Sequence, residues 1–413
     1  MTEPLIRPKR KDPLKRSRQP TLPPGWRSRT AHVLTRVAAE GRFALQFCPA
    51  CDEYCYPSRE ACPHCLGTDL IMKDAPRDGV VLSETTVRVP SDVYFRERAP
   101  WRIGLVELSC GPVLVSHLHG DCKAGDTIRM SFQIDKAGQA VAFARPKAET
   151  PFMSDDKQWR EMTADPKFRR VLITNGRTPV GQEMALALKA AGASILFVGI
   201  AEPWKPFPGE DTLRGIEGVD IVPLDVSDEK SVFDLAADIG GKVDILINTN
   251  EHIRAGGLFD RTGTTTSHVE IGQVYMGLVH LAQAFGPAMR SRGADGTNSA
   301  AAWVNILSAY ALTNWPKFGQ YSAVQAACLS LSQCLRAELR PGGVRVMNAF
   351  SGPLDTEWFQ TLPPPKVAPR ALAAAVVRGL KEGIEDVFVG EVAEDIRKRF
   401  AANPKALERE LGE

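Results

Sequence analysis

The chain has 413 residues, of which 44% are apolar and 24% charged, and its formal net charge is +2. This composition predicts a soluble globular protein with about two to three domains. No apolar run reaches the roughly 18 residues of a membrane span, and no signal-peptide pattern opens the sequence, so we expect a cytoplasmic protein without membrane attachment. Two CxxC pairs among the nine cysteines favour a reducing compartment with metal-bound thiolates over a disulfide framework.

Residues 1–30 form a basic, proline-rich segment. It carries nine Lys or Arg against only Glu3 and Asp12, and it has no apolar periodicity. We expect an extended arm, which is either a solvated tail or a segment that lies over a partner or a neighbouring domain. Nucleic-acid binding is not favoured, because no basic, aromatic-bearing surface continues beyond the arm.

Residues 31–75 predict a helix followed by a zinc ribbon. An amphipathic pattern over 31–40 ends at Gly41. The segment FCPACDEYCYPSREACPHC then has the spacing C-x2-C-x10-C-x2-C, in which two CxxC turns direct four thiolates at one centre. The expected zinc ligands are Cys48, Cys51, Cys62 and Cys65. Cys55 and His64 complete no pair. Four protein ligands leave no open position, so the predicted zinc supports folding and not catalysis.

Residues 76–146 predict a small all-β barrel. Short alternating runs such as VVLSETTVRV and TIRMSFQI are separated by Gly, Asp and Pro turns. His117 and His119 lie on the same side of one predicted strand and could form a metal pair. No third ligand is near them, so we interpret them as part of an exposed barrel face.

The segment 31–146 resembles the zinc-ribbon/OB-fold family that accompanies thiolases and SCP2-type thiolase-like aldolases in acyl-CoA metabolism. The matching phrases are EGRFALQFCPAC, PSREACPHC, GVVLSETTV, GLVEL and FARP. The resemblance implies a non-catalytic module whose barrel and preceding helix dock on a thiolase or aldolase partner and help form an acyl-CoA site. An oligonucleotide is disfavoured because ribbon and barrel are close to neutral.

A polar stretch at 147–167 predicts a linker, and residues 168–413 then alternate strands and helices as in a doubly wound α/β Rossmann sheet. The first strand is expected at 171–174 and the first helix at 179–191, with Pro179 in the opening turn, where a missing N–H costs nothing. The order and lengths of the elements resemble the short-chain dehydrogenase/reductase (SDR) family over 168–413.

By that resemblance, Ser308 and Tyr321 stand at the catalytic positions. In the family the Ser holds the substrate oxygen and the Tyr passes it a proton. A Lys four residues after the Tyr lowers the phenol pKa and holds the nicotinamide ribose. Here Gln325 stands at the Lys position and Val274 at the position of a proton-relay Asn. Because a neutral amide does not stabilise a phenolate, we predict a site that has lost its chemistry.

The family's phosphate loop, TGxxxGxG, reads TNGRTPVG over 174–181. Asn175 and Pro179 replace glycines, and Pro179 offers no N–H to a diphosphate. Gly199 stands where an Asp often grips the NAD ribose, Lys205 could meet a 2′-phosphate, and Glu251 ends a segment that reads NTNE instead of NNAG. The retained, weak cofactor-binding candidates are Thr174, Asn175, Gly176, Gly181, Asp225, Asn248 and Thr356.

Two functions remain open. The favoured one is an accessory or scaffold subunit of an acyl-CoA-processing thiolase or aldolase complex, with structural zinc, doubtful NAD(P) binding and an inactive SDR domain. Such a chain is expected in a homo- or hetero-oligomer, with a competent SDR subunit as a further candidate partner. The alternative is an active NAD(P)-dependent oxidoreductase for a 3-hydroxyacyl-CoA or 3-ketoacyl-CoA type of substrate, in which Ser308 and Tyr321 act.

Overall fold

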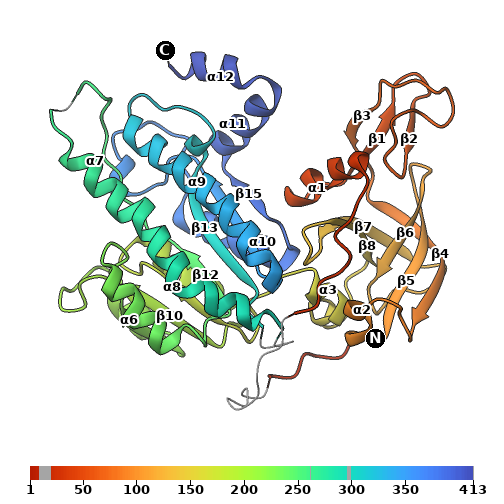
Figure 1. Ribbon diagram of the computed structural model, residues 1–413, viewed down its shortest axis with the longest axis horizontal. Helices are drawn as coiled ribbons and strands as arrows, with labels where there is room; N and C mark the ends of the chain where they lie inside the picture. Colours follow the sequence, from red (N-terminus) through yellow and green to blue (C-terminus); the bar gives the residue numbers. More distant parts are fainter. Residues whose placement is uncertain (9–19, 261, 295–298, 413) are drawn as a thin grey trace. The chain divides into compact units, whose positions relative to one another are not determined.

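The computed structural model describes residues 1–8, 20–260, 262–294 and 299–412. Its contacts divide the chain into two compact units (Figure 1). Unit 1 comprises Met1–Arg7, Thr21–Asp165 and Leu380–Glu385, and unit 2 comprises Pro8–Pro20, Pro166–Gly379 and Asp386–Glu413. Of the predicted basic arm, residues 9–19 lie outside the described residues.

Unit 1 starts with a helix and a small three-stranded sheet. Helix α1 (His32–Ala39), which follows η1 (Arg29–Ala31), buries Leu34, Val37 and Ala38. The chain then turns at Gly41, whose φ of 66° suits a residue without a side chain. The sheet has the strand order β2-β1-β3. Its strands are β1 (Ala44–Cys48), β2 (Glu53–Cys55) and β3 (Ile71–Asp74).

A closed barrel with the order β4-β5-β6-β8-β7 forms the rest of unit 1, as the alternating runs predicted. Its strands are β4 (Asp78–Val87), β5 (Trp101–Leu108), β6 (Val113–Leu118), β7 (Thr127–Ile134) and β8 (Ala140–Pro146), with α2 (Val93–Glu97) between β4 and β5. All strand pairs are antiparallel except β6 with β8. Closure leaves no free strand edge, and the inward side chains form one core with those of α1.

The exposed barrel face predicted for His117 and His119 is wrong. His119 is fully buried, and its Nε2 lies 2.9 Å from the carbonyl oxygen of Met153. His117 Nδ1 accepts a hydrogen bond of 2.8 Å from Trp101 Nε1, and burial lowers the His117 pKa to about 4. Both rings therefore serve the packing of the barrel wall.

The segment 147–167, expected as a linker, contains η2 (Met153–Asp155) and α3 (Lys157–Glu161). Trp159 of α3 is buried against Phe143 of β8, with ring centroids 5.2 Å apart. Asp156 caps α3 by accepting from the Trp159 N–H, so most of this polar-looking stretch is packed on the barrel.

Unit 2 contains a seven-stranded parallel sheet with the order β11-β10-β9-β12-β13-β14-β15. The strands are β9 (Arg170–Ile173), β10 (Ile195–Ile200), β11 (Val219–Pro223), β12 (Ile245–Asn248), β13 (Ala302–Ser308), β14 (Arg345–Ser351) and β15 (Asp386–Val389). The order reverses beside β9, and the carboxyl ends of strands at such a reversal are where doubly wound folds bind ligands. The predicted Rossmann architecture is confirmed.

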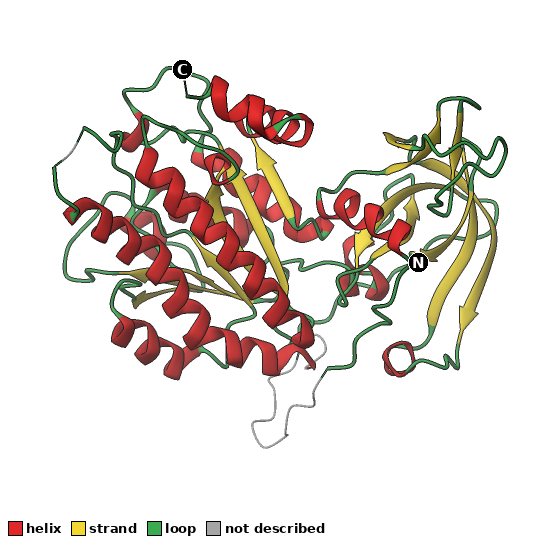
Figure 2. Ribbon diagram, turned by 45° about the horizontal axis from the view of Figure 1, so that its top comes forward, coloured by secondary structure: helices red, strands yellow, loops and turns green. Residues whose placement is uncertain are grey.

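The helices of unit 2 connect these strands (Figure 2). They are α4 (Pro179–Ala190), α5 (Glu210–Arg214), α6 (Glu229–Ile239), α7 (Thr265–Glu270), the π-helical η3 (Ile271–Met276), α8 (Gly277–Ser291), η4 (Arg292–Ala294), η6 (Ala309–Ala311), α9 (Gly319–Leu339), η7 (Arg340–Gly342), η8 (Glu357–Phe359), α10 (Pro369–Glu382), α11 (Glu391–Ala402) and α12 (Pro404–Glu410). Helices α8 and α9 lie side by side (Figures 1 and 2).

Candidate functional site

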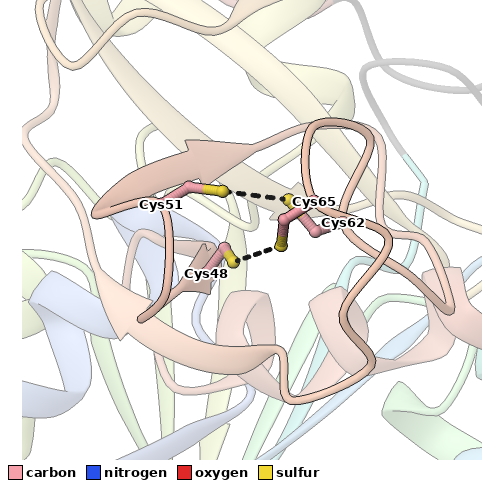
Figure 3. Close-up of side chains that lie close together, drawn as sticks. All are labelled: Cys48, Cys51, Cys62 and Cys65. Carbon is pink, nitrogen blue, oxygen red and sulfur yellow. Dashed lines mark hydrogen bonds between the residues drawn. The ribbon is translucent and has the colours of Figure 1, made fainter.

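The four predicted zinc ligands converge on one point in the ribbon (Figure 3). Their sulfur atoms all lie within 4.8 Å of one another, and the pairs Cys48–Cys65 and Cys51–Cys62 are 3.6 and 3.8 Å apart. A tetrahedral zinc with Zn–S bonds of about 2.3 Å places its sulfurs about 3.8 Å apart. The cluster therefore has the dimensions of a closed structural zinc site.

The chemistry of the thiols also fits a bound cation. Backbone N–H groups of Cys65 and His64 point at the Cys62 sulfur and lower its pKa to about 6. The hydrogen bond with Cys65 and burial raise the pKa of Cys51 above its usual range, because clustered thiolates repel one another. A zinc ion bound by all four residues would neutralise this repulsion between thiolates. It would also cross-link the two CxxC segments of the ribbon.

The SDR-type site lies where β13 ends and α9 begins. Ser308 closes β13, Tyr321 lies in the first turn of α9, and Gln325 follows one turn later. All three side chains are buried. The Gln325 Oε1 accepts a hydrogen bond of 3.0 Å from the Ser308 backbone N–H. The amide thus fixes the end of the strand, which an ammonium group, having no acceptor, could not do.

The phenol of Tyr321 is held in its neutral form. Burial raises its pKa well above the usual range, and the charge of Glu251 raises it further, while the Ser308 hydroxyl acts in the opposite direction. No positively charged residue is among the main causes of this shift. A proton leaves such a phenol only at a large cost in free energy, so it is a poor general acid–base near neutral pH.

A stack of aromatic rings covers Tyr321. Trp315 lies parallel to Tyr310 at 4.0 Å and to Phe318 at 4.1 Å between centroids. Phe359 lies 6.1 Å from Trp315 and 6.4 Å from Tyr321. The cavity that Ser308 and Tyr321 line measures about 10 Å³, which is room for about one water molecule. Tyr310, Trp315 and Phe318 stand within YALTNWPKFGQY and Phe359 comes from a later segment, so the sequence did not reveal that these rings are in contact.

Glu251, which follows β12, lines this cavity. It also lines a second cavity, whose lining residues include Asp225. Burial raises the pKa of its carboxyl group to about 7. Among the described residues, its carboxylate makes no hydrogen bond or ion pair. The second cavity measures about 110 Å³, below the roughly 300–1,000 Å³ of typical small-molecule pockets. The sequence signal for Glu251 was its place in NTNE, at the position of the family's glycine.

Several backbone donors of the phosphate loop between β9 and α4 are engaged within the protein. Four of its N–H groups have partners within 3.1 Å. These bonds are Asn175 N to Thr249 Oγ1, Gly176 N to Gly199 O, Arg177 N to Asn175 Oδ1, and Gly181 N to Thr178 Oγ1. A Cβ on Gly181 would lie 1.9 Å from the Asn175 carbonyl oxygen, so close packing alone requires this glycine.

The basic residues beside the loop are also engaged. The Arg177 guanidinium donates to the carbonyl oxygens of Glu202 and Lys205 at 2.9 and 3.0 Å and lies over the Phe207 ring. The Lys205 Nζ lies 3.2 Å from a Glu202 carboxylate oxygen. Neither cation is held toward a 2′-phosphate.

The remaining residues that the sequence singled out differ in their hydrogen bonds and burial. Asn248 Oδ1 accepts from the Thr174 hydroxyl, and Asp225 Oδ1 accepts from the N–H and hydroxyl of Ser227. Val274 lies on the π-helical turn η3 and is buried in the apolar core. Thr356 differs from these, because its buried hydroxyl oxygen has no hydrogen-bond partner among the described residues. An orphaned hydroxyl there would suit a polar ligand atom.

Three family models match the chain in succession. Residues 36–70 match the "ChsH2, rubredoxin-like zinc ribbon domain", residues 73–133 the "ChsH2, C-terminal OB-fold domain", and residues 169–366 the "short chain dehydrogenase". The chain therefore joins ChsH2-type zinc ribbon and OB-fold domains to a short chain dehydrogenase domain, which confirms the predicted fusion. In the described residues, no helix has the length and apolar character to cross a membrane.

Curated relatives match parts of the chain. "Probable oxidoreductase EphD" of Mycobacterium tuberculosis is 31% identical over 195 residues, which cover 46% of this chain and 32% of EphD. "Short-chain dehydrogenase ptmH" of Penicillium ochrochloron is 30% identical over 163 residues, or 37% of this chain and 56% of that protein. The chain thus spans about one third to just over half the length of these relatives.

Solved structures resemble the dehydrogenase domain. A short chain dehydrogenase of Burkholderia cenocepacia in complex with NADP is 28% identical, with a TM-score of 0.53, over 59% of this chain and 97% of that one. A putative short-chain dehydrogenase of Novosphingobium aromaticivorans is 20% identical, with a TM-score of 0.50, over 58% of this chain and 86% of that one, and shows the fold alone.

Proposed function

We propose that this chain is a non-catalytic subunit of an acyl-CoA-processing complex, in which the ribbon and barrel dock on a thiolase-like enzyme and the SDR-type domain serves as a scaffold. One observation carries the proposal: the space beside Ser308 and Tyr321 is reduced to about 10 Å³. Nicotinamide and a substrate carbonyl must both reach a catalytic Tyr, and this space admits neither without rearrangement.

The polar groups around Tyr321 and in the phosphate loop support the same proposal. Gln325 supplies no charge to Tyr321 and is committed to the Ser308 N–H. Glu251 brings a carboxyl group to the cavity that Ser308 and Tyr321 line, and a negative charge there raises the phenol pKa, whereas a catalytic base needs a lowered one. Four N–H groups of the phosphate loop donate to acceptors of the protein itself. These residues do not fit NAD(P).

An active oxidoreductase is the second candidate, and two observations favour it. The orphaned Thr356 hydroxyl would suit a cofactor amide, and the Burkholderia cenocepacia relative was solved with NADP. For this candidate to hold, the aromatic stack and Glu251 must move away from Tyr321 when the cofactor binds. The substrate would then be a 3-ketoacyl-CoA or 3-hydroxyacyl-CoA.

A groove between α8 and α9 supports the expected oligomer. It measures about 810 Å³, and Val279, Ala282, Gly286, Leu331 and Leu335 are among its lining residues. The exposed positions of α9 beside it carry small side chains: Ala323, Ala326, Ala327, Ser330 and Cys334. Small side chains let a second helix approach closely. We propose that a second copy of this chain packs here.

Co-purification and turnover test the proposal together. The zinc-loaded full chain, co-expressed with the thiolase-like protein encoded nearest to it, should co-purify with that enzyme and raise its thiolytic or retro-aldol rate. Alone, it should not oxidise NADPH in the presence of a 3-ketoacyl-CoA. A chain that reduces 3-ketoacyl-CoA unaided and binds no such enzyme would contradict the proposal.

A further inference from the structure

Three arginines gather on the barrel of unit 1, outside the ribbon and the SDR-type site. Arg129 of β7 lies directly opposite Arg145 of β8 in the antiparallel register, so both side chains leave the same face of the barrel. Arg77 comes just before β4, and its carbonyl oxygen accepts a hydrogen bond of 2.7 Å from Met130, the residue after Arg129. We call Arg77, Arg129 and Arg145 the arginine cluster.

No carboxylate of the described residues forms an ion pair with the arginine cluster. The carboxylate of Asp78, opposite Arg129 in the register, lies 2.8 Å from the ammonium of Lys147. The cluster's own contacts are with uncharged groups: Arg77 Nη2 donates to the Gly41 carbonyl oxygen at 2.8 Å, and the Arg145 guanidinium lies 4.1 Å above the Trp159 ring. Two of its guanidinium groups are therefore held in place by uncharged groups, and none is in an ion pair among the described residues.

Arg102, on the same barrel, differs from the arginine cluster in its hydrogen bonds. Arg102 donates to the carbonyl oxygens of His119, Gly120 and Cys122 and pairs with Glu84. Both terminal nitrogens of Arg102 therefore donate within the fold. The guanidinium of Arg129, which is exposed, makes no such bonds with the part of the chain that the structure describes.

Grouping like charges at partly buried positions works against folding. Burial lowers the pKa of Arg145, the charge of Glu382 opposes this, and the charges of Arg129 and Arg77 lower the pKa further. Burial and the charge of Arg129 likewise lower the pKa of Arg77, while the charges of Glu382 and Asp74 act in the opposite direction. A multivalent anion would relieve this repulsion, and the planar guanidinium matches phosphate oxygens in a bidentate way.

We propose that the arginine cluster binds the phosphate groups of a small phosphate-bearing ligand. Arg129, the most accessible member, would make the first contact, and Arg145 and Arg77 would complete the cradle. The inference is independent of the proposed function, since it requires neither a thiolase-like partner nor an inactive SDR-type site.

Calorimetric titration of the zinc-loaded full chain with inorganic pyrophosphate tests this site. We expect saturable binding that weakens as salt is raised, because several ionic contacts form at once. Arg129→Ala should weaken binding at least about tenfold, since it removes one charge-assisted contact. Arg88→Ala, which removes an exposed arginine just beyond the end of β4, is the matched control and should bind like the wild type.

A second readout separates a ligand site from a structural role. Without pyrophosphate, Arg129→Ala should unfold at the same or a higher temperature than the wild type, because the repulsion within the cluster falls. Pyrophosphate should raise the unfolding temperature of the wild type and not that of the variant. Equal binding by the two variants, or destabilisation of ligand-free Arg129→Ala, would overturn the proposal.

Further ligands identify the source of the phosphate. Binding of coenzyme A but not pantetheine would assign the site to the nucleotide phosphates of that coenzyme. Binding of pyrophosphate but not coenzyme A would support a phosphate site for another small molecule. Tight binding of a single-stranded oligonucleotide in the absence of binding to either small ligand would overturn the proposal.

Discussion

Replacing Gln325 with leucine should destabilise unit 2 without affecting any oxidoreductase chemistry. The side chain is 3% exposed, and its Oε1 is the acceptor for the Ser308 N–H at 3.0 Å. Leucine is of similar size but accepts no hydrogen bond, so the buried N–H loses its partner at a cost of about 1–3 kcal/mol. For a unit of this size, roughly 2 kcal/mol lowers the unfolding temperature by about 4–8 °C.

Scanning calorimetry of the zinc-loaded full chain measures this shift. Gln333→Leu makes the same chemical change at an exposed position of the same helix and should stay within about 0.5 kcal/mol of the wild type. If Gln325→Leu unfolds at the temperature of this control, Gln325 does not hold the end of β13. If it instead lowers an oxidoreductase rate at unchanged stability, Gln325 acts in chemistry and our reasoning about the site is refuted.

Three further predictions concern other groups. Cys62→Ser should lower the zinc content from about one per chain toward zero in elemental analysis and unfold unit 1 while unit 2 persists; retained zinc would contradict the four-thiolate site. Burial raises the Glu251 pKa from 4.5 to about 7, so the stabilisation by its protonated form is complete below about pH 4.5 and lost as the pH rises through about 7. Between pH 5 and 8, Glu251→Gln should therefore gain on the order of 1–3 kcal/mol over the wild type in denaturant unfolding, and a pH-independent difference would refute the burial argument. Ala327→Arg should convert a dimer to monomers in light scattering, whereas a wild type that is itself monomeric would exclude packing through α8 and α9.

Features set by local chemistry could be predicted from the sequence. The zinc site follows from the spacing of four cysteines, because each CxxC turn fixes its own two sulfurs. The strand that ends at Ser308 and the helix that carries Tyr321 follow from apolar runs and breakers. The order of these elements along the chain then predicted the doubly wound sheet.

Features that depend on contacts between distant segments could not be predicted. The stack over Tyr321 includes Phe359, which comes from a separate loop. The burial of His119 depends on the carbonyl of Met153 in a segment whose polar composition suggested a linker. The role of Gln325 as an acceptor for Ser308 is likewise visible only in three dimensions, because the sequence shows the loss of a charge but not what replaces it.

The affinity of the wild-type chain for NADPH tests the central claim most directly. Isothermal titration of the zinc-loaded chain should give no binding tighter than about 1 mM, because Glu251 and the aromatic stack line the space beside Tyr321 and four N–H groups of the phosphate loop already donate to the protein. A dissociation constant in the micromolar range, with the exothermic signal saturating at one NADPH per chain, would contradict the account.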